Sequence, residues 1–293
     1  MQIAFFGLGN MGFPIAANLL KAGHSVTTAV HRDPSPALRL QELGGHIAAS
    51  PEEALRGAEL IFTIVPDDSA LLGLLSDAFL SALPAGSTVV EMTSASAAAA
   101  EKAAALCAAH GVSLLDAPVS GGVKGAASGT MSMLCAGDRA VFDHVAPVLG
   151  NIAGKLCYVG GRPGQGKIIK SLNNLLSAVN KTAVGEAWRM AEAHGVDPDA
   201  FFDAVSASSG DSAALRASFP KIRSGDYTPG FTVALMRKDL ELAMSLADGM
   251  TLPMGEAVLD YYRRAREFDS EDSTAVAKVR YPGRKERFCD GAF

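Results

Sequence analysis

A glycine-rich turn between an apolar run and a helical pattern constrains this chain most. Residues 2–6 are largely apolar, as in a buried strand, and residues 11–22 carry apolar side chains at helical spacing up to Gly23. Between them, Gly7-Leu8-Gly9-Asn10-Met11-Gly12 matches the pattern G-x-G-x-x-G. Such glycines permit a tight turn, the approach of a pyrophosphate to the backbone, and close packing of helix on strand. We therefore predict a dinucleotide-binding Rossmann unit.

The rest of the N-terminal half alternates between apolar runs and helical patterns. Residues 60–65 (LIFTIV) are nearly all apolar, which is typical of a strand buried on both faces. Ser50-Pro51-Glu52-Glu53 combines a capping serine, a first-turn proline and an acidic third position, which predicts a helix start. This alternation predicts an α/β fold with a doubly wound, mainly parallel sheet. The expected strands are 2–6, 25–30, 60–65, 88–92, 113–116, 131–136 and 156–159, and helices are expected at 11–22, 34–43 and 96–109.

The pattern changes after residue 162. One long helical pattern runs from 164 to 195, and strand signals nearly vanish beyond it. We predict a Rossmann domain over residues 1–162 and an all-α domain over 163–293, opened by this long interdomain helix. Residues 281–293 are polar and marked by Gly and Pro, as in a loose tail. The shorter helices are expected at 198–207, 212–222, 231–249 and 253–267.

Composition excludes several classes of protein. The 293 residues suit two domains, and 48% hydrophobic with 19% charged residues allow large cores. A net charge of -5, with no basic run before the C-terminus, argues against nucleic acid as a partner. No apolar run reaches the roughly 18 residues of a membrane span, and no secretory signal opens the chain, so we expect a cytoplasmic protein. The four cysteines fit neither a zinc site nor a disulfide framework, so we predict no metal.

The end of the second expected strand bears on the choice of cofactor. The chain there reads Val30-His31-Arg32-Asp33. An arginine at this place accommodates the 2′-phosphate of NADP, whereas an acidic residue binds the ribose hydroxyl of NAD. Arg32, with His31, favours NADP, but Asp33 precedes Pro34 and serves either NAD or a turn. We therefore predict NADP as the preferred cofactor and keep NAD as an alternative.

Four ordered motifs resemble those of the β-hydroxyacid dehydrogenases, within the 6-phosphogluconate dehydrogenase superfamily. The resemblance spans residues 3 to about 240 and is carried by the opening GLGNMGFPIAANLLKAGH, by DAPVSGG at 116–122, by GQGKIIKSLNN at 164–174, and by Gly230-Phe231 with Lys238-Asp239-Leu240. It implies an enzyme acting on CH–OH donors, which transfers a hydride between NAD(P)(H) and a small β-hydroxyacid or semialdehyde. It also implies a homodimer or homotetramer.

The resemblance assigns the catalytic role to Lys170. Reduction of an aldehyde places negative charge on the carbonyl oxygen, and a positioned cation that also gives a proton lowers that barrier. Asn174 follows four residues later, on the same helix face, where its amide can hold the reacting oxygen or orient the lysine. Lys167, three residues before Lys170, is the main rival for this role, although the Asn-Asn spacing selects Lys170.

Other motif residues are assigned to ligands. Ser120, Gly121 and Gly122 follow a strand at its carboxyl end, where open parallel sheets bind ligands, and a hydroxyl with glycine N–H groups suits a carboxylate. Phe231 joins them as an expected substrate contact by resemblance. Beside the fingerprint turn, the expected cofactor contacts are His31, Arg32, Val65, Pro66, Thr93, Ser94 and Lys238.

Three alternatives stay open at this point. An imine reductase shares the architecture, but those enzymes usually carry a different residue in place of Lys170. A true 6-phosphogluconate dehydrogenase is disfavoured by the short helical domain. A catalytically silent dinucleotide-binding protein would not need Lys170, Asn174 and Ser120 together. As for the substrate, the 3-hydroxyisobutyrate subgroup carries a tryptophan after a Ser-Ser-Gly segment, and residues 208–213 (SSGDSA) lack one.

Overall fold

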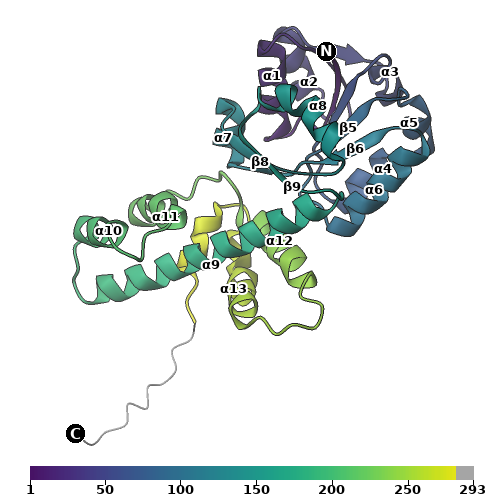
Figure 1. Ribbon diagram of the computed structural model, residues 1–293. Helices are drawn as coiled ribbons and strands as arrows, with labels where there is room; N and C mark the ends of the chain where they lie inside the picture. The colour runs from purple at the N-terminus through teal and green to yellow at the C-terminus, as the bar shows by residue number, and fades with distance from the viewer. Residues whose placement is uncertain (282–293) are drawn as a thin grey trace, which may run out of the picture. The chain divides into compact units, whose positions relative to one another are not determined.

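The computed structural model describes residues 1–281, which fall into two compact units (Figure 1). The first comprises Met1–Leu175 and Asp239–Met250, and the second comprises Leu176–Lys238 and residues 251–281. The predicted tail at 281–293 lies, apart from Tyr281, outside the described residues. The predicted boundary near residue 162 stays a prediction.

The first unit is built on a nine-stranded, mainly parallel sheet. Six parallel strands follow the order β3-β2-β1-β4-β5-β6, so the order reverses between β1 and β4, where ligands bind in such sheets. Beyond β6, β8 pairs antiparallel with β6 and β7 and parallel with β9. The strands are β1 (Gln2–Phe6), β2 (Ser25–Ala29), β3 (His46–Ala48), β4 (Leu60–Thr63), β5 (Thr88–Glu91), β6 (Ser113–Asp116), β7 (Val119–Ser120), β8 (Met131–Ala136) and β9 (Ala153–Gly160).

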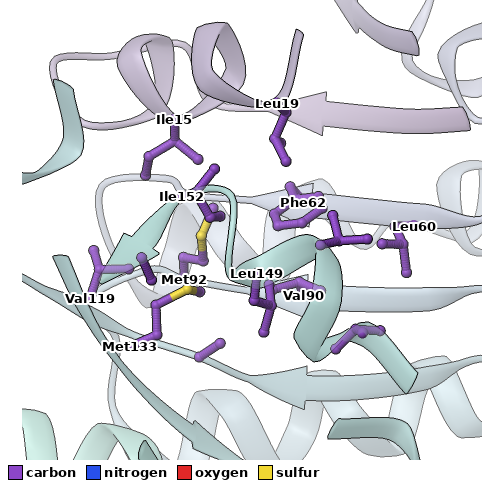
Figure 2. Close-up of a cluster of buried hydrophobic side chains, with 14 of the residues drawn as sticks. Ile15, Leu19, Leu60, Phe62, Val90, Met92, Val119, Met133, Leu149 and Ile152 are labelled. Carbon is purple, nitrogen blue, oxygen red and sulfur yellow. The ribbon is translucent and has the colours of Figure 1, made fainter. Parts of the chain in front are cut away.

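Helices cover both faces of the sheet, each over its own hydrophobic cluster. One face carries α1 (Gly12–Lys21), α2 (Ser35–Glu42), α7 (Gly122–Ser128) and α8 (Arg139–Leu149), and the other carries α3 (Pro51–Ala54), α4 (Asp68–Leu74), α5 (Asp77–Ala82) and α6 (Ala97–Ala109) (Figure 1). Figure 2 shows the first cluster, where Ile15 and Leu19 of α1 lie over Phe62 and Val90 of the sheet. Because both faces of the sheet are covered, the apolar runs in central strands such as β1 and β4 are explained.

The expected strands all form, and so does the helix start at Ser50. The Ser50 hydroxyl accepts the Glu53 N–H at 3.2 Å, and the Glu53 carboxylate in turn accepts the Ala49 N–H. The sequence prediction missed β3, β7, α4, α5, α7 and α8. The first five of these elements are short, and the 11-residue α8 contains Pro147, which weakens a helical pattern.

The second unit is helical in its described residues. The 29-residue helix α9 (Gln165–Ala193) begins in the first unit and supplies its last turns to the second, as the long helical pattern predicted. Trp188 of this helix packs edge-on against Phe201 and Phe219, and so belongs to a hydrophobic core. The other helices are α10 (Pro198–Ser206), α11 (Ala213–Ser224), α12 (Val233–Ser245), which returns to the first unit, α13 (Pro253–Arg264) and the 3₁₀ turns η1 (Ala265–Phe268) and η2 (Ser273–Lys278).

Candidate active site

The fingerprint turn joins β1 to α1 at the place where the strand order reverses. Gly7 has a φ of 101°, and a Cβ there would lie 2.0 Å from the Ile64 carbonyl oxygen. A Cβ on Gly12 would lie 1.8 Å from the Gly7 carbonyl oxygen. A Cβ on Gly9, by contrast, would meet no heavy atom within 4 Å. Two glycines are therefore required by packing, whereas Gly9 leaves its outer side open to a ligand.

The N-terminus of α1 fits a pyrophosphate. Met11 at the cap makes no side-chain hydrogen bond to the helix, and the first turn contains no acidic residue. At the start of α6, the Ser96 hydroxyl instead accepts the Ala99 N–H. The Phe13 N–H donates to the Gly9 carbonyl and Pro14 has no N–H, so the positive end of the α1 dipole, without a side-chain cap, is what suits an anion. The exposed Gly9 and Asn10 border this place, while Leu8 packs partly against the core.

Two neighbouring strand ends are joined by their predicted cofactor residues. The Val65 N–H, just after β4, donates to the Thr93 hydroxyl after β5 at 3.0 Å. Thr93 is buried, and its own N–H donates to the Glu91 carboxylate at 2.7 Å. Pro66 is exposed and Ser94 half-buried beside them. The structure therefore brings Val65 and Thr93 together as a single hydrogen-bonded ledge.

His31 and Arg32 lie in the exposed loop between β2 and α2. The neighbouring Asp33 carboxylate accepts the Ser35 N–H at 2.9 Å, and this bond lowers the pKa of the carboxyl group. Asp33 thus serves the turn into α2, which is one of its two interpretations from sequence. Arg32 is left with an exposed guanidinium beside the end of β2, the place where a 2′-phosphate is bound in this fold.

The Ser-Gly-Gly segment follows β6, with Ser120 at the end of β7, Gly121 at the cap of α7 and Gly122 at the start of that helix. Gly121 and Gly122 have φ values of 137° and 61°, which side chains rarely adopt. A Cβ on Gly121 would also lie 3.3 Å from the Met131 backbone. Ser120 pairs with Ser132 of β8 and is half-buried. The segment therefore places the half-buried Ser120 next to the exposed Gly121, at the junction of β7 and α7.

Lys170 lies in a buried hydrogen-bond chain, not on the helix surface. Its side chain is 8% exposed, and its Nζ donates to the Asn174 Oδ1 at 3.2 Å. The Asn174 Nδ2 in turn donates to Asp239 of α12 at 2.5 Å. A carboxylate only accepts, so Asp239 fixes which end of the Asn174 amide faces it and turns the carbonyl oxygen toward Lys170. The lysine and asparagine of the motif are thus brought together, with Asp239 as a partner that the sequence prediction missed.

Lys167 has a different environment. It is 1% exposed, and its Nζ lies 2.5 Å from the Glu91 carboxylate and 3.0 Å from the Asp116 carboxylate. Burial opposes the charge, but the two carboxylates outweigh it and raise the pKa of the ammonium. A lysine held charged in this way is a poor acid or base, so the geometry favours Lys170 over its rival.

The remaining predicted residues belong to the second unit. The Phe231 carbonyl accepts the Ser273 N–H at 2.7 Å, and the Gly230 N–H donates to the Asp272 carboxylate at 3.0 Å. These bonds fix the half-buried Phe231 ahead of α12. Lys238 is half-buried on α12, directly before Asp239.

Glu91, Asp116 and Asp239 were missed as residues of the site. Asp116 and Asp239 do stand inside the motifs at 116–122 and 238–240, so a signal was present. Glu91 gave none, because a single acidic residue at a strand end does not reveal its partner. Among residues 1–281, no group of three or more His, Cys, Asp or Glu side chains could hold a metal, and no helix is long and apolar enough to cross a membrane.

Comparison with known proteins decides the family. The family model for the NAD-binding domain of 6-phosphogluconate dehydrogenase matches residues 2–160, and that for NAD-binding of NADP-dependent 3-hydroxyisobutyrate dehydrogenase matches residues 164–281. A probable 3-hydroxyisobutyrate dehydrogenase from Mycobacterium tuberculosis is 36% identical over 94% of this chain and 96% of its own length. The chain belongs to the β-hydroxyacid dehydrogenase family. As a member, it is an NAD(P)-dependent hydroxyacid dehydrogenase.

Further relatives show the breadth of this family. The 2-(hydroxymethyl)glutarate dehydrogenase of Eubacterium barkeri is 34% identical over 95% of this chain and 94% of its own length. A solved M. tuberculosis 3-hydroxyisobutyrate dehydrogenase with L-serine has a TM-score of 0.88, with 34% identity over 94% of this chain and 97% of that chain. An imine reductase from Streptomyces aurantiacus is more distant, with a TM-score of 0.64 and 27% identity over 95% of this chain and 99% of that chain.

Proposed function

We propose that this β-hydroxyacid dehydrogenase uses Lys170 as general acid and base on a small substrate that carries a carboxylate, with NADP(H) preferred. The observation that carries the proposal is the buried chain from Lys170 through Asn174 to Asp239. The bound nicotinamide supplies or accepts the hydride. The chain's own residues must then orient the substrate and move one proton.

Lys170 is the residue suited to that proton. In reduction, its ammonium gives a proton to the carbonyl oxygen as negative charge develops there, and in oxidation the neutral amine takes the alcohol proton. The Asn174 amide oxygen directs the Nζ without adding a charge that would retain the proton. Asp239 holds the amide in that orientation.

The substrate class follows from the Ser-Gly-Gly loop and from the relatives. The Ser120 hydroxyl and the N–H groups of Gly121 and Gly122 suit a carboxylate. The relatives are named for 3-hydroxyisobutyrate and 2-(hydroxymethyl)glutarate, and one solved relative holds L-serine. Each of these acids carries a CH₂OH group on the carbon next to a carboxylate. We therefore propose β-hydroxyacids of this type, or their semialdehydes, as substrates.

The tryptophan that the 3-hydroxyisobutyrate subgroup carries after its Ser-Ser-Gly segment is absent at that place in this chain. Ser212, after the Ser-Ser-Gly segment, caps α11 by accepting the Leu215 N–H, and Ala213 opens that helix. Trp188 is occupied in the core of the second unit. The proposal therefore names a substrate class rather than 3-hydroxyisobutyrate itself.

The test compares Lys170→Ala and Lys170→Arg with Lys102→Ala, an exposed control lysine on α6. NADPH depletion is first followed over a panel of short semialdehydes and β-hydroxyacids to find the best substrate. Lys170→Ala should then lower kcat by at least about 100-fold, because general acid–base catalysis contributes about that much or more. Lys170→Arg should retain only part of the wild-type kcat, because a guanidinium group does not give up its proton near neutral pH. Full turnover by Lys170→Ala would contradict the proposal.

An imine reductase activity is the second candidate, supported by the likeness to the S. aurantiacus enzyme. The same NADPH assay with cyclic imines separates the two. Faster turnover of imines than of every semialdehyde tested, unaffected by Lys170→Ala, would favour this second function.

A further inference from the structure

Three oxygens lie close to the buried Lys167 ammonium. Its Nζ lies 2.5 Å from Glu91 Oε2, 3.2 Å from the Glu91 carbonyl oxygen and 3.0 Å from Asp116 Oδ1. The Glu91 carbonyl oxygen accepts a hydrogen bond from the ammonium, and the two carboxylate oxygens form ion pairs with it. Glu91 and Asp116 end the neighbouring strands β5 and β6, so one side chain of α9 ties two strand ends together.

The other oxygens of both carboxylates accept backbone N–H groups. Asp116 Oδ2 accepts from Gly164 at 2.8 Å and from Lys167 at 3.2 Å, which fixes the first turn of α9. Glu91 Oε1 accepts from Thr93 at 2.7 Å. A Cβ on Gly166 would lie 2.4 Å from the Leu134 carbonyl oxygen, so this turn has no room to shift toward the sheet.

The connection continues into the ledge described above. The Thr93 hydroxyl accepts the Val65 N–H at 3.0 Å, which extends the chain of bonds to the end of β4. One arm of the Lys167 network thus ends at two expected cofactor contacts. The other arm fixes the helix turn that precedes Lys170 by three residues.

The buried charges of Lys167, Glu91 and Asp116 do not by themselves indicate that the network serves to stabilise the fold. Buried ion pairs are often no more stabilising than apolar residues of the same shape, because desolvation offsets their attraction. Such pairs can also fix one geometry, and here the groups held in place are the Thr93 N–H and the first turn of α9. We propose that Lys167 is a positioning residue, which sets the Glu91 carboxylate so that Thr93 and Val65 present their backbone correctly to the cofactor. This inference rests on the proposed cofactor role of Thr93 and Val65.

The first test removes the cation. Lys167→Met keeps an apolar chain of similar length and leaves Glu91 and Asp116 facing each other without it. The other titratable group here is Cys135 of β8, whose pKa is raised to about 12 by burial and by Asp116, so it stays neutral in the assay. NADPH dissociation constants are measured by fluorescence at pH 8.5 and pH 6, with Lys155→Met as an exposed control. For Lys167→Met, we expect an NADPH dissociation constant about 10-fold larger than that of wild type at pH 8.5. At pH 6 the affinity should recover, because one of the two carboxyl groups takes up a proton.

The second test restores the geometry without the charge. In Lys167→Met/Glu91→Gln, the glutamine oxygen still accepts the Thr93 N–H and the surplus negative charge is gone, so affinity should return to within about 3-fold of wild type at pH 8.5. A merely structural role would lower the urea midpoint of the cofactor-free protein and leave NADPH affinity within about 2-fold. That outcome for Lys167→Met would overturn the proposal.

A further pair keeps the test decisive if Lys167→Met does not fold. Glu91→Gln and Glu91→Leu both leave Lys167 paired with Asp116, but only glutamine accepts the Thr93 N–H. Glu91→Leu should weaken NADPH binding about 10-fold more than Glu91→Gln, and equal affinities would refute the positioning role. Lys170→Ala tests the proposed function separately, because that variant should lose turnover, whereas Lys167→Met should lose NADPH affinity.

Discussion

The same substitution at two glycines of the fingerprint turn should give opposite results. A Cβ on Gly12 would lie 1.8 Å from the Gly7 carbonyl oxygen and 2.8 Å from the Ile64 side chain, so Gly12→Ala forces α1 away from β1. A Cβ on Gly9 would meet nothing within 4 Å, so the fold tolerates Gly9→Ala. The first change acts on packing, and the second acts only on what approaches the turn from outside.

The magnitudes follow from these distances. Overpacking of this kind costs about 1–3 kcal/mol, which is less than the roughly 5–15 kcal/mol that holds a domain folded, so Gly12→Ala should fold with a lower Tm. Gly9→Ala should leave the free energy of unfolding unchanged or raise it by up to about 1 kcal/mol, because alanine restricts the unfolded chain. Loss of a charge-assisted contact to the pyrophosphate should weaken its NADPH binding by about 1.5–3 kcal/mol, or roughly 10–100-fold.

Urea unfolding without cofactor and fluorescence titration with NADPH separate the two effects. Gly73→Ala is the matched control, since its Cβ also meets nothing within 4 Å and the residue lies on α4. It should leave NADPH binding unchanged. Normal NADPH affinity in Gly9→Ala, or normal stability in Gly12→Ala, would refute the reasoning.

Three further outcomes are expected. Arg32→Ala should raise the dissociation constant of NADPH about 10–100-fold and barely change that of NADH, whereas tighter binding of NADH by the wild type would refute the NADP preference. If Ser120 and its loop hold a carboxylate, the methyl ester of the best acid should have a much lower kcat/KM, and equal values would exclude that role. Burial opposes the charge of Asp272, but bonds from Lys221 and the Gly230 N–H outweigh it and lower its pKa to about 2. Asp272→Asn should therefore lower the free energy of unfolding by roughly 2 kcal/mol at pH 7. In urea titrations, this difference from wild type should shrink as the pH falls from about 4 to about 2. A difference that does not change with pH would show that these bonds to the carboxylate are unimportant.

The sequence predicts best those helices whose apolar residues recur at regular helical spacing and those strands that are apolar along their whole length. Strands such as Leu60–Thr63, buried on both faces, and the 29-residue helix α9 carry such patterns over their whole length. The strands β3 and β7 have three and two residues, too few to show any period. They form because the neighbouring strands β2 and β8 provide hydrogen-bond partners, which is information from elsewhere in the chain.

The strand-end part of the site was predictable for a geometric reason. Parallel strands end at one edge of the sheet, so the fingerprint turn, Val65 and Thr93 follow strand ends wherever the strands lie in sequence. Ser120 instead ends β7, which pairs antiparallel with β8. The partners within the site were not predictable in this way. Glu91 lies 76 residues before Lys167, and Asp239 lies 65 residues after Asn174, so only the fold shows that they meet.

These distant partners also explain how two lysines one turn apart on α9 come to differ. Sequence spacing alone places Lys167 and Lys170 on adjacent turns of one helix, each with a pKa near 10 when free. Lys167 meets two carboxylates, which raise the pKa of its ammonium and favour the charged form, as the proposed positioning role requires. Lys170 meets the amide oxygen of Asn174, and the acidic Asp239 is placed behind that amide. The Asn174 contact thus orients Lys170 without adding a charge, which suits the proposed role of a group that gives and takes a proton.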